Sequence, residues 1–261
     1  MEVHMDIYEY NQKAWTNASL KEDKYTIALS DEEITAAKSG EWKFKLTPTK
    51  LVPQQWFGDI NGKNVLCLAA SGGQQAPLLA ILGANVTVFD ICQEQLNKDN
   101  AIAKKFGLNI KTKQGNMLDL SCFDNESFDI IVHAVSNCFI ENVTKVWEEC
   151  FRVLKPNGIM IASFLNPVNY LFDMDALKNG EFIVKYTIPY SDLQQLNKSR
   201  LNKYMNQLEP IEFGHTLEDQ IGGQLKAGFK LYGLYEDSNG GLDPLDKYID
   251  IFIVTLAKKT N

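Results

Sequence analysis

The sequence predicts an α/β fold in which a mostly parallel sheet alternates with helices and ends in an antiparallel pair of strands. Three observations lead to this prediction. Short apolar runs alternate with segments of helical periodicity from residue 64 onward. A turn of small residues, Ser71 to Gly73, follows the first apolar run. Near the C-terminus, two strand-like runs are joined by the loop EDSNGGLDPLDK, which contains no helix and therefore favours antiparallel pairing.

The segment from residue 64 to residue 90 has the outline of a nucleotide-binding unit. Val65–Ala70 is an apolar run typical of a strand buried on both faces, and helical periodicity follows over Gln74–Leu82. Glycines in the turn between them allow backbone to approach a ligand, and the start of the helix favours negative charge. Asp90 ends the next strand, where a carboxylate can accept both hydroxyls of a ribose. The alternative interpretation is a tight turn beside a solvated aspartate.

The remaining elements continue this alternation toward the C-terminus. Apolar residues recur at helical spacing in 93–106 and 141–154. A capping box predicts another helix over 216–228, with Leu217, Ile221 and Leu225 on its inward face. Further strands are predicted at 110–114, 128–134, 159–164, 229–235 and 248–256.

The pattern divides the chain into an N-terminal segment, 1–56, and a domain, 57–261. Within that domain, residues 165–215 have weak periodicity and several aromatic residues, so we expect an insertion that covers the carboxyl ends of the strands as a substrate cap. In the N-terminal segment, residues 6–18 predict an amphipathic helix, and a capping box at Ser30 begins a second one. We expect this segment to form a helical lid, and simple packing against the sheet edge is the alternative.

Composition limits the classes of partner. With 261 residues and 45% hydrophobic content, the chain can bury a substantial core. The net charge of −7 argues against a broad basic surface for nucleic acid. The five cysteines contain no C-x-x-C pair, so neither disulfides nor a metal site is expected. The N-terminal residues lack the pattern of a signal peptide, and no stretch approaches a membrane span. These features predict a cytoplasmic monomer or homodimer.

Five motifs of the chain follow a pattern shared by one known family: VLCLAASGG, VTVFD, QGNMLDL, FDIIVHAVSN and RVLKPNGIMIASF. With these motifs the chain resembles, over residues 57–164 and 216–257, the class I S-adenosylmethionine-dependent methyltransferases, including the ubiquinone and menaquinone methyltransferase-like group. The resemblance implies a Rossmann-like sheet of seven strands, with the last one antiparallel and helices on both faces. It also implies S-adenosylmethionine as the cofactor and a small molecule as the methyl acceptor.

The resemblance also assigns cofactor contacts to residues of this chain. The first motif departs from the family pattern of an acidic residue followed by glycines at alternate positions. Cys67 replaces the acid, and only one of the glycines is kept. The implied contacts lie at the carboxyl ends of four strands: Ala69, Ser71, Gly73 and Gln74 beside methionine and ribose, Asp90 on the ribose hydroxyls, Ile91, Asn116 and Met117 at the adenine, and Val135 and Ser136 facing the sulfonium.

The implied reaction is an in-line displacement in which an O, N, S or C nucleophile attacks the methyl group. Such a reaction depends mainly on placement, and it needs a base only if the nucleophile must lose a proton. The candidate bases are His133, His215, Glu212 and Tyr190. Two other functions stay open. An NAD-dependent oxidoreductase also has an acid at the second strand end, although G-x-G-x-x-G is missing. The degenerate first motif permits a non-catalytic S-adenosylmethionine-binding protein.

Overall fold

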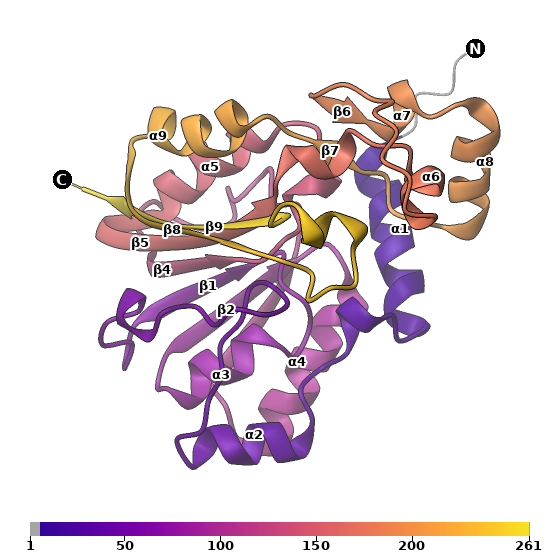
Figure 1. Ribbon diagram of the computed structural model, residues 1–261. Coiled ribbons are helices and arrows are strands. Elements are labelled where there is room, and N and C mark those ends of the chain that lie inside the picture. The colour runs from indigo at the N-terminus through magenta and orange to yellow at the C-terminus, as the bar shows by residue number, and fades with distance from the viewer. Residues whose placement is uncertain (1–5, 261) are drawn as a thin grey trace.

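The computed structural model describes residues 6–260 and contains a seven-stranded sheet with helices on both faces (Figure 1). The strand order is β3-β2-β1-β4-β5-β9-β8. The first five of these strands pair in parallel, and β9 runs antiparallel to both of its neighbours, as the sequence predicted. The strands are β1 (Asn64–Leu68), β2 (Asn85–Asp90), β3 (Ile110–Gln114), β4 (Phe128–His133), β5 (Leu154–Leu165), β8 (Phe229–Asp237) and β9 (Phe252–Lys259).

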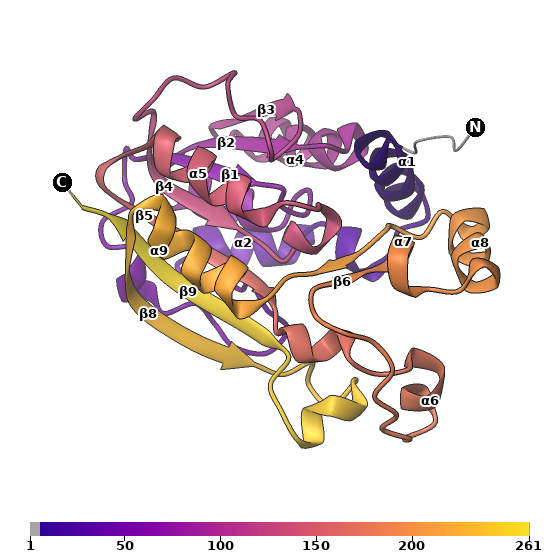
Figure 2. The same cartoon turned by 90° about the horizontal axis from the view of Figure 1, so that it is seen from above.

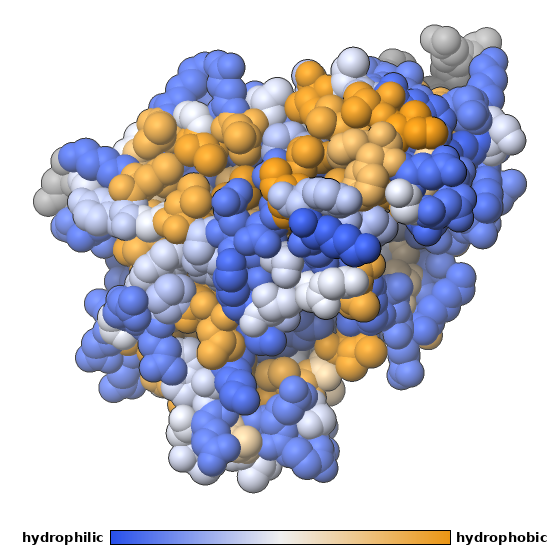
Figure 3. All heavy atoms as spheres, viewed as in Figure 1, coloured by the Kyte–Doolittle hydropathy of each residue, from blue (hydrophilic) through white to orange (hydrophobic). Residues whose placement is uncertain are grey.

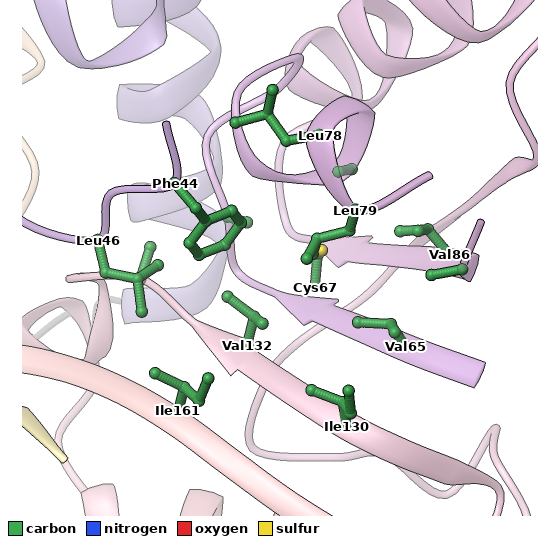
Figure 4. Packing of buried hydrophobic residues seen from close by; sticks show 14 of the residues in the cluster. Phe44, Leu46, Val65, Cys67, Leu78, Leu79, Val86, Ile130, Val132 and Ile161 are labelled. Carbon is green, nitrogen blue, oxygen red and sulfur yellow. The ribbon is translucent and has the colours of Figure 1, made fainter. Parts of the chain in front are cut away.

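Alternating residues of β1 enter two different cores. Val65 and Cys67 belong to one buried cluster, whereas Leu66 belongs to the other, on the opposite face of the sheet. This alternation follows from the two-residue period of a strand, and burial on both faces explains why the whole run is apolar. Figure 4 shows Cys67 close to Leu79 of the helix that follows β1, with Phe44 of the N-terminal segment beside them.

Helices cover both faces of this sheet (Figure 2). On one face α5 packs against α9, and on the other α2, α3 and α4 lie together. The turn after β1 is followed directly by α3, so the chain reverses at the edge of the sheet where the parallel strands end. These helices are α2 (Asp31–Lys38), α3 (Gln75–Ile81), α4 (Gln93–Phe106), α5 (Val143–Val153) and α9 (Gly223–Ala227).

The helix expected at 216–228 differs from its prediction. Its first part, Glu218–Gly222, is a π-helical turn, which adds a residue per turn and rotates the buried face. Leu217 and Leu225 are therefore 44% and 51% exposed, and the prediction that they face inward was wrong. Figure 3 shows hydrophobic residues on the surface over α9. Gly223 instead contacts the indole of Trp147, where a Cβ would lie 2.8 Å from its Cδ1 atom.

The insertion after β5 contains more regular structure than its weak periodicity indicated. Both ribbon views place it beside α1, beyond the carboxyl ends of the parallel strands. The last strand begins at Phe252, four residues later than expected. A 3-10 turn, Pro244–Lys247, which the Asp243 carboxylate caps, lies directly before the predicted start of the strand. The elements of the insertion are α6 (Met174–Lys178), β6 (Tyr190–Ser191), α7 (Asp192–Gln195), α8 (Lys198–Gln207) and β7 (Phe213–Gly214).

The N-terminal segment divides between two locations. Helix α1 (Ile7–Leu20) contacts α4 at the end of the sheet, whereas α2 and the stretch after it pack into the core with Phe44 and Leu46. The predicted capping box of α2 is confirmed, with Ser30 and Glu33 bonding to each other's backbone N–H groups. Within residues 6–260, no helix combines the length and apolarity needed to cross a membrane.

Candidate active site

A cavity of about 840 Å³ opens at the carboxyl ends of β1, β2, β3 and β4. Helix α1 forms one wall, and the insertion adds Leu193 and Leu201. This volume is near the upper end of the range of roughly 300–1,000 Å³ for ligand pockets, so it has room for more than one small ligand. Eight of the ten predicted cofactor contacts line the cavity: Ala69, Ser71, Asp90, Ile91, Asn116, Met117, Val135 and Ser136.

Asp90 presents a buried carboxyl group to this cavity. It is the last residue of β2 and is 8% exposed. Its Oδ1 atom accepts the Cys92 N–H at 2.7 Å, which fixes the orientation of the group. Burial raises the pKa of Asp90 to about 7. A carboxylate has about four lone-pair sites, so it can accept two ligand hydroxyls in addition to this N–H.

The third strand end provides a second polar group. The Oδ1 atom of Asn116 accepts the Leu118 N–H at 2.9 Å, so the side chain forms an Asx turn that shapes the loop after β3. Met117, next to it, is 9% exposed and belongs to the core beneath the cavity. Ile91, at the end of β2, lines the same part of the cavity. Apolar side chains beside a backbone-fixed amide can hold a flat heterocycle and contact its polar edge.

Side chains of α4 hold the turn after β1 in place from the side facing away from the cavity. Gly72 donates its N–H to Oε1 of Gln95, and Gly73 donates its N–H to Oδ1 of Asp99, each at 2.8 Å. A Cβ on Gly72 would lie 2.1 Å from the Gln95 carbonyl oxygen, so this close approach requires glycine. Both glycine amides therefore point toward α4, and Ala69 and Ser71 are the residues of the turn that face the cavity. The expectation that these glycine amides face a ligand was wrong.

The two remaining predicted contacts lie behind the turn. A Cβ on Gly73 would contact Ala28 and Ile102 at 2.6 and 2.8 Å, so this glycine packs between the N-terminal segment and α4. Gln74 donates its side-chain amide to the carbonyl of Ile27 at 2.8 Å. Neither residue lines the cavity, because both connect the turn to the chain that precedes α2.

Asp99 introduces an acid close to the position where the first motif lacks one. It is 1% exposed, and its charge contributes to raising the pKa of the buried Cys67 thiol, after burial itself. Burial raises the pKa of Asp99 to about 7. Its Oδ2 atom is buried and has no hydrogen-bond partner among residues 6–260. The carboxyl group that holds the turn therefore comes from α4 rather than from β1.

The four predicted bases do not line the cavity. His133 is fully buried, its Nδ1 lies 3.0 Å from the Leu68 carbonyl, and burial lowers its pKa to about 4. His215 lies with Nε2 3.0 Å from the Asn137 carbonyl, and burial lowers its pKa as well. Both imidazoles bond to backbone in the described structure, which gives them a local structural role.

Glu212 and Tyr190 belong to a buried polar cluster in the insertion. The Glu212 carboxylate accepts the Tyr170 hydroxyl at 2.8 Å, and burial raises the pKa of Glu212 to about 7. Tyr190 donates its hydroxyl to Asp192 at 2.7 Å and stacks on Tyr170. These contacts hold the small two-stranded sheet of β6 and β7 in place, away from the cavity.

Comparison with known proteins identifies the family. A methyltransferase-domain family matches residues 66–162. An uncharacterized methyltransferase of Bacillus subtilis (strain 168), YbaJ, is 48% identical over 250 residues, which cover 96% of this chain and 97% of that protein. The chain belongs to the S-adenosylmethionine-dependent methyltransferases. A ubiquinone biosynthesis O-methyltransferase of Rickettsia canadensis (strain McKiel) is 27% identical, over 69% of this methyltransferase and 70% of that one.

Solved structures agree with the fold of this methyltransferase. A putative S-adenosylmethionine-dependent methyltransferase from Listeria monocytogenes superposes with a TM-score of 0.60 at 17% identity, covering 87% of this chain and all of that one. A Burkholderia thailandensis 1,6-didemethyltoxoflavin-N1-methyltransferase, solved with S-adenosylhomocysteine, superposes with a TM-score of 0.59 at 12% identity. The match covers 97% of this chain and 88% of that one. The cofactor of the family is S-adenosylmethionine, which decides against the NAD-dependent oxidoreductase. The methyltransferase-domain match and the 48% identical methyltransferase identify the chain as an enzyme rather than a non-catalytic binder.

The cavity of this methyltransferase fits S-adenosylmethionine. A buried carboxyl at the end of β2, an Asx turn at the end of β3 and an apolar floor match a ribose, an adenine edge and an adenine face. Three functional residues were not predicted from the sequence: Gln95 and Asp99, which support the turn, and Asn11, which anchors α1. Buried polar residues on the inward face of a helix, such as Gln95 and Asp99 four residues apart, were the available signal.

Proposed function

We propose that the chain transfers the methyl group of S-adenosylmethionine to a small-molecule acceptor by in-line displacement. The observation that carries this proposal is one cavity that joins the strand ends to α1 and the insertion. The named relatives support the acceptor class, since one is a ubiquinone biosynthesis O-methyltransferase and one solved structure holds 1,6-didemethyltoxoflavin.

The residues at the strand ends would hold the cofactor, whose sulfonium supplies an electrophilic methyl group. The carboxylate of Asp90 would accept the ribose hydroxyls. Ile91 and Met117 would pack on the adenine, and Asn116 would contact its edge. The remaining predicted contacts that line the cavity, on the methionine and sulfonium side, are Ala69, Ser71, Val135 and Ser136.

Placement and exclusion of water would supply most of the catalysis. Among the described residues that line the cavity there is no histidine or lysine to act as a base. Holding a nucleophile in contact with the methyl group, in line with the breaking bond, removes much of the entropic barrier. Helix α1 would act as the lid, with Trp15 packed edge-on against Phe139 at 4.9 Å between ring centroids. The insertion would act as the substrate cap.

Calorimetry with S-adenosylmethionine, S-adenosylhomocysteine and NAD tests the cofactor assignment. We expect both sulfur nucleosides to bind at micromolar concentrations and NAD not to bind. Transfer of labelled methyl groups into a small-molecule extract, followed by mass spectrometry, then tests the reaction and identifies the acceptor. Binding of NAD alone, or label that enters only protein or nucleic acid added in parallel, would contradict the proposal.

A further inference from the structure

The acceptor side of the cavity has a distinctive charge pattern. Among residues 6–260, no lysine, arginine or histidine lines the cavity, whereas three acidic residues do: Asp6, Asp90 and Glu141. Asp90 is assigned above to the ribose. The other two lie outside the strand ends assigned to the cofactor, one at the start of α1 and one just before α5.

The carboxylates of Asp6 and Glu141 differ in their hydrogen bonding. The Asp6 carboxylate accepts the N–H groups of Tyr8 and Glu9, so it caps α1 and occupies the amides that could otherwise bind an anion. Glu141 is exposed and makes no hydrogen bond or ion pair with another described residue. A ligand in the cavity therefore meets an uncompensated negative charge at Glu141.

Apart from the Tyr8 hydroxyl, the walls formed by α1 and the insertion offer little to an anion. Asn11 points its amide away, donating to the carbonyls of Phe139 and Ile211 at 2.9 and 3.1 Å and accepting the Ile211 N–H at 2.8 Å. Trp15, with Phe139 against it, and the two leucines from the insertion provide an apolar surface. An apolar body thus has a place to pack, and an anionic group has no cation to neutralise it.

The basic residues of the insertion lie elsewhere. A separate cavity of about 610 Å³ is lined by Lys178, Lys185, Arg200 and Lys203. Arg200 belongs to the same helix as Leu201, which lines the first cavity. The positive charges of α8 are therefore outside the active-site cavity.

We propose that the methyl acceptor has an apolar, ring-sized body and is uncharged or amine-bearing, and that Glu141 excludes acceptors carrying a carboxylate or phosphate. This inference rests on the proposed function, because it assigns the remaining part of the cavity to the acceptor. The family assignment does not specify the charge of the methyl acceptor.

Three ligands with the same phenylpropyl body separate charge from shape: phenylpropylamine, phenylpropanol and phenylpropionate. Their binding to the protein is measured by calorimetry or ligand-observed NMR, with and without saturating S-adenosylhomocysteine. We expect phenylpropionate to bind at least tenfold more weakly than each of the others. A phenylpropionate affinity within tenfold of either one, including equal failure of all three to bind, overturns the proposal.

Charge reversal tests the residue. Glu141→Lys should improve phenylpropionate binding at least tenfold and weaken phenylpropylamine binding. The affinities of Glu141→Gln for both ligands should lie between those of the wild type and those of Glu141→Lys. Glu148→Lys, an exposed position on α5 with the same change in net charge, is the matched control and should leave the ranking unchanged. Equal effects of the two lysine variants would overturn the role of Glu141. Failure of S-adenosylhomocysteine to bind would contradict the proposed function. It would not affect the test of Glu141, because the affinities of the three ligands are also ranked in the absence of S-adenosylhomocysteine.

Discussion

Asp90 is the single side chain on which cofactor binding should depend most. Replacing it with alanine removes the acceptor for two ribose hydroxyls, so we expect S-adenosylmethionine to bind at least tenfold more weakly, about 1.4 kcal/mol. Because the pKa of Asp90 is raised to about 7, the ionised form that accepts these hydroxyls is lost as pH falls through 7. Affinity measured by calorimetry should therefore decrease from pH 8 to pH 6.

Asp90→Asn provides the control for this pH dependence. The amide oxygen can still accept the Cys92 N–H, so the local backbone is retained while the titrating group is removed. The variant should bind weakly with a flat profile between pH 6 and pH 8. Unchanged affinity in Asp90→Ala, or the same pH profile in Asp90→Asn, would remove Asp90 from the site.

Ala69 shows the cost of the unusual first motif. Its φ is +47°, in the left-handed region that a residue with a Cβ adopts at a cost of roughly 1–2 kcal/mol. Glycine, which the family prefers here, relieves this strain but adds freedom to the unfolded chain. We expect Ala69→Gly to raise the free energy of unfolding by about 0.5–1 kcal/mol in urea denaturation. Ala70→Gly, a neighbour for which no positive φ is found, should instead destabilise the protein, and the reverse order would contradict this assignment of strain.

Residues differ in how far the sequence can predict their roles. Asp90 could be predicted because its function follows from a local pattern, a carboxylate at the end of a strand. Gln95 and Asp99 could not, because their bonds to Gly72 and Gly73 depend on how α4 packs against the turn. The same limit applies to His133 and His215, whose bonds to backbone carbonyls join segments far apart in the chain.

At the scale of elements, the buried side chain of Asn11 helps to hold α1 over the cavity, together with the bonds that Tyr10 and Gln12 make to backbone outside the helix. Asn11 makes three hydrogen bonds, to Phe139 and Ile211, and is 2% exposed. Asn11→Ala leaves these backbone groups unpaired, so α1 should detach more readily, and we expect the KM for S-adenosylmethionine to rise at least fivefold. Lys13→Ala, an exposed position on the same helix, is the control. An Asn11→Ala enzyme with unchanged KM would show that α1 is not a lid.

Helices and strands could be predicted where a single hydrophobic pattern or a local capping signal extends over the element. The buried strands β1 and β4 have continuous apolar runs, and the capping box of α2 is a local signal. The helix at 216–228 was misread because a π-helical turn rotates its inward face, and no residue pattern marks that turn. The insertion was difficult for another reason: its helices are short, and its polar cluster forms only when β6 meets β7.

At the scale of the whole molecule, buried titratable groups predict how stability changes with pH. Asp90, Asp99 and Glu212 have pKa values raised to about 7, above their ordinary values of 3.8 to 4.5. Between about pH 4 and pH 7 the folded protein therefore binds more protons than the unfolded chain, and the contribution of these groups to stability is lost progressively as pH rises across this interval. His133 has the opposite effect, because its pKa is lowered to about 4, so its contribution is lost only as pH falls below 6.5.

Because three raised carboxyl groups outweigh one lowered imidazole, the stability of the protein without cofactor should decrease from pH 5 to pH 8. The free energy of unfolding, measured in urea at several pH values across this interval, tests the decrease. Asp99→Asn keeps an acceptor for the Gly73 N–H but removes one buried charge, so the decrease should be smaller by about 1 kcal/mol or more. Saturating S-adenosylmethionine should stabilise the protein more at pH 8 than at pH 6, since it binds the ionised form of Asp90. Stability that rises steadily from pH 6 to pH 8 in the wild type would show that these carboxyl groups are ionised at ordinary pH values in the folded protein.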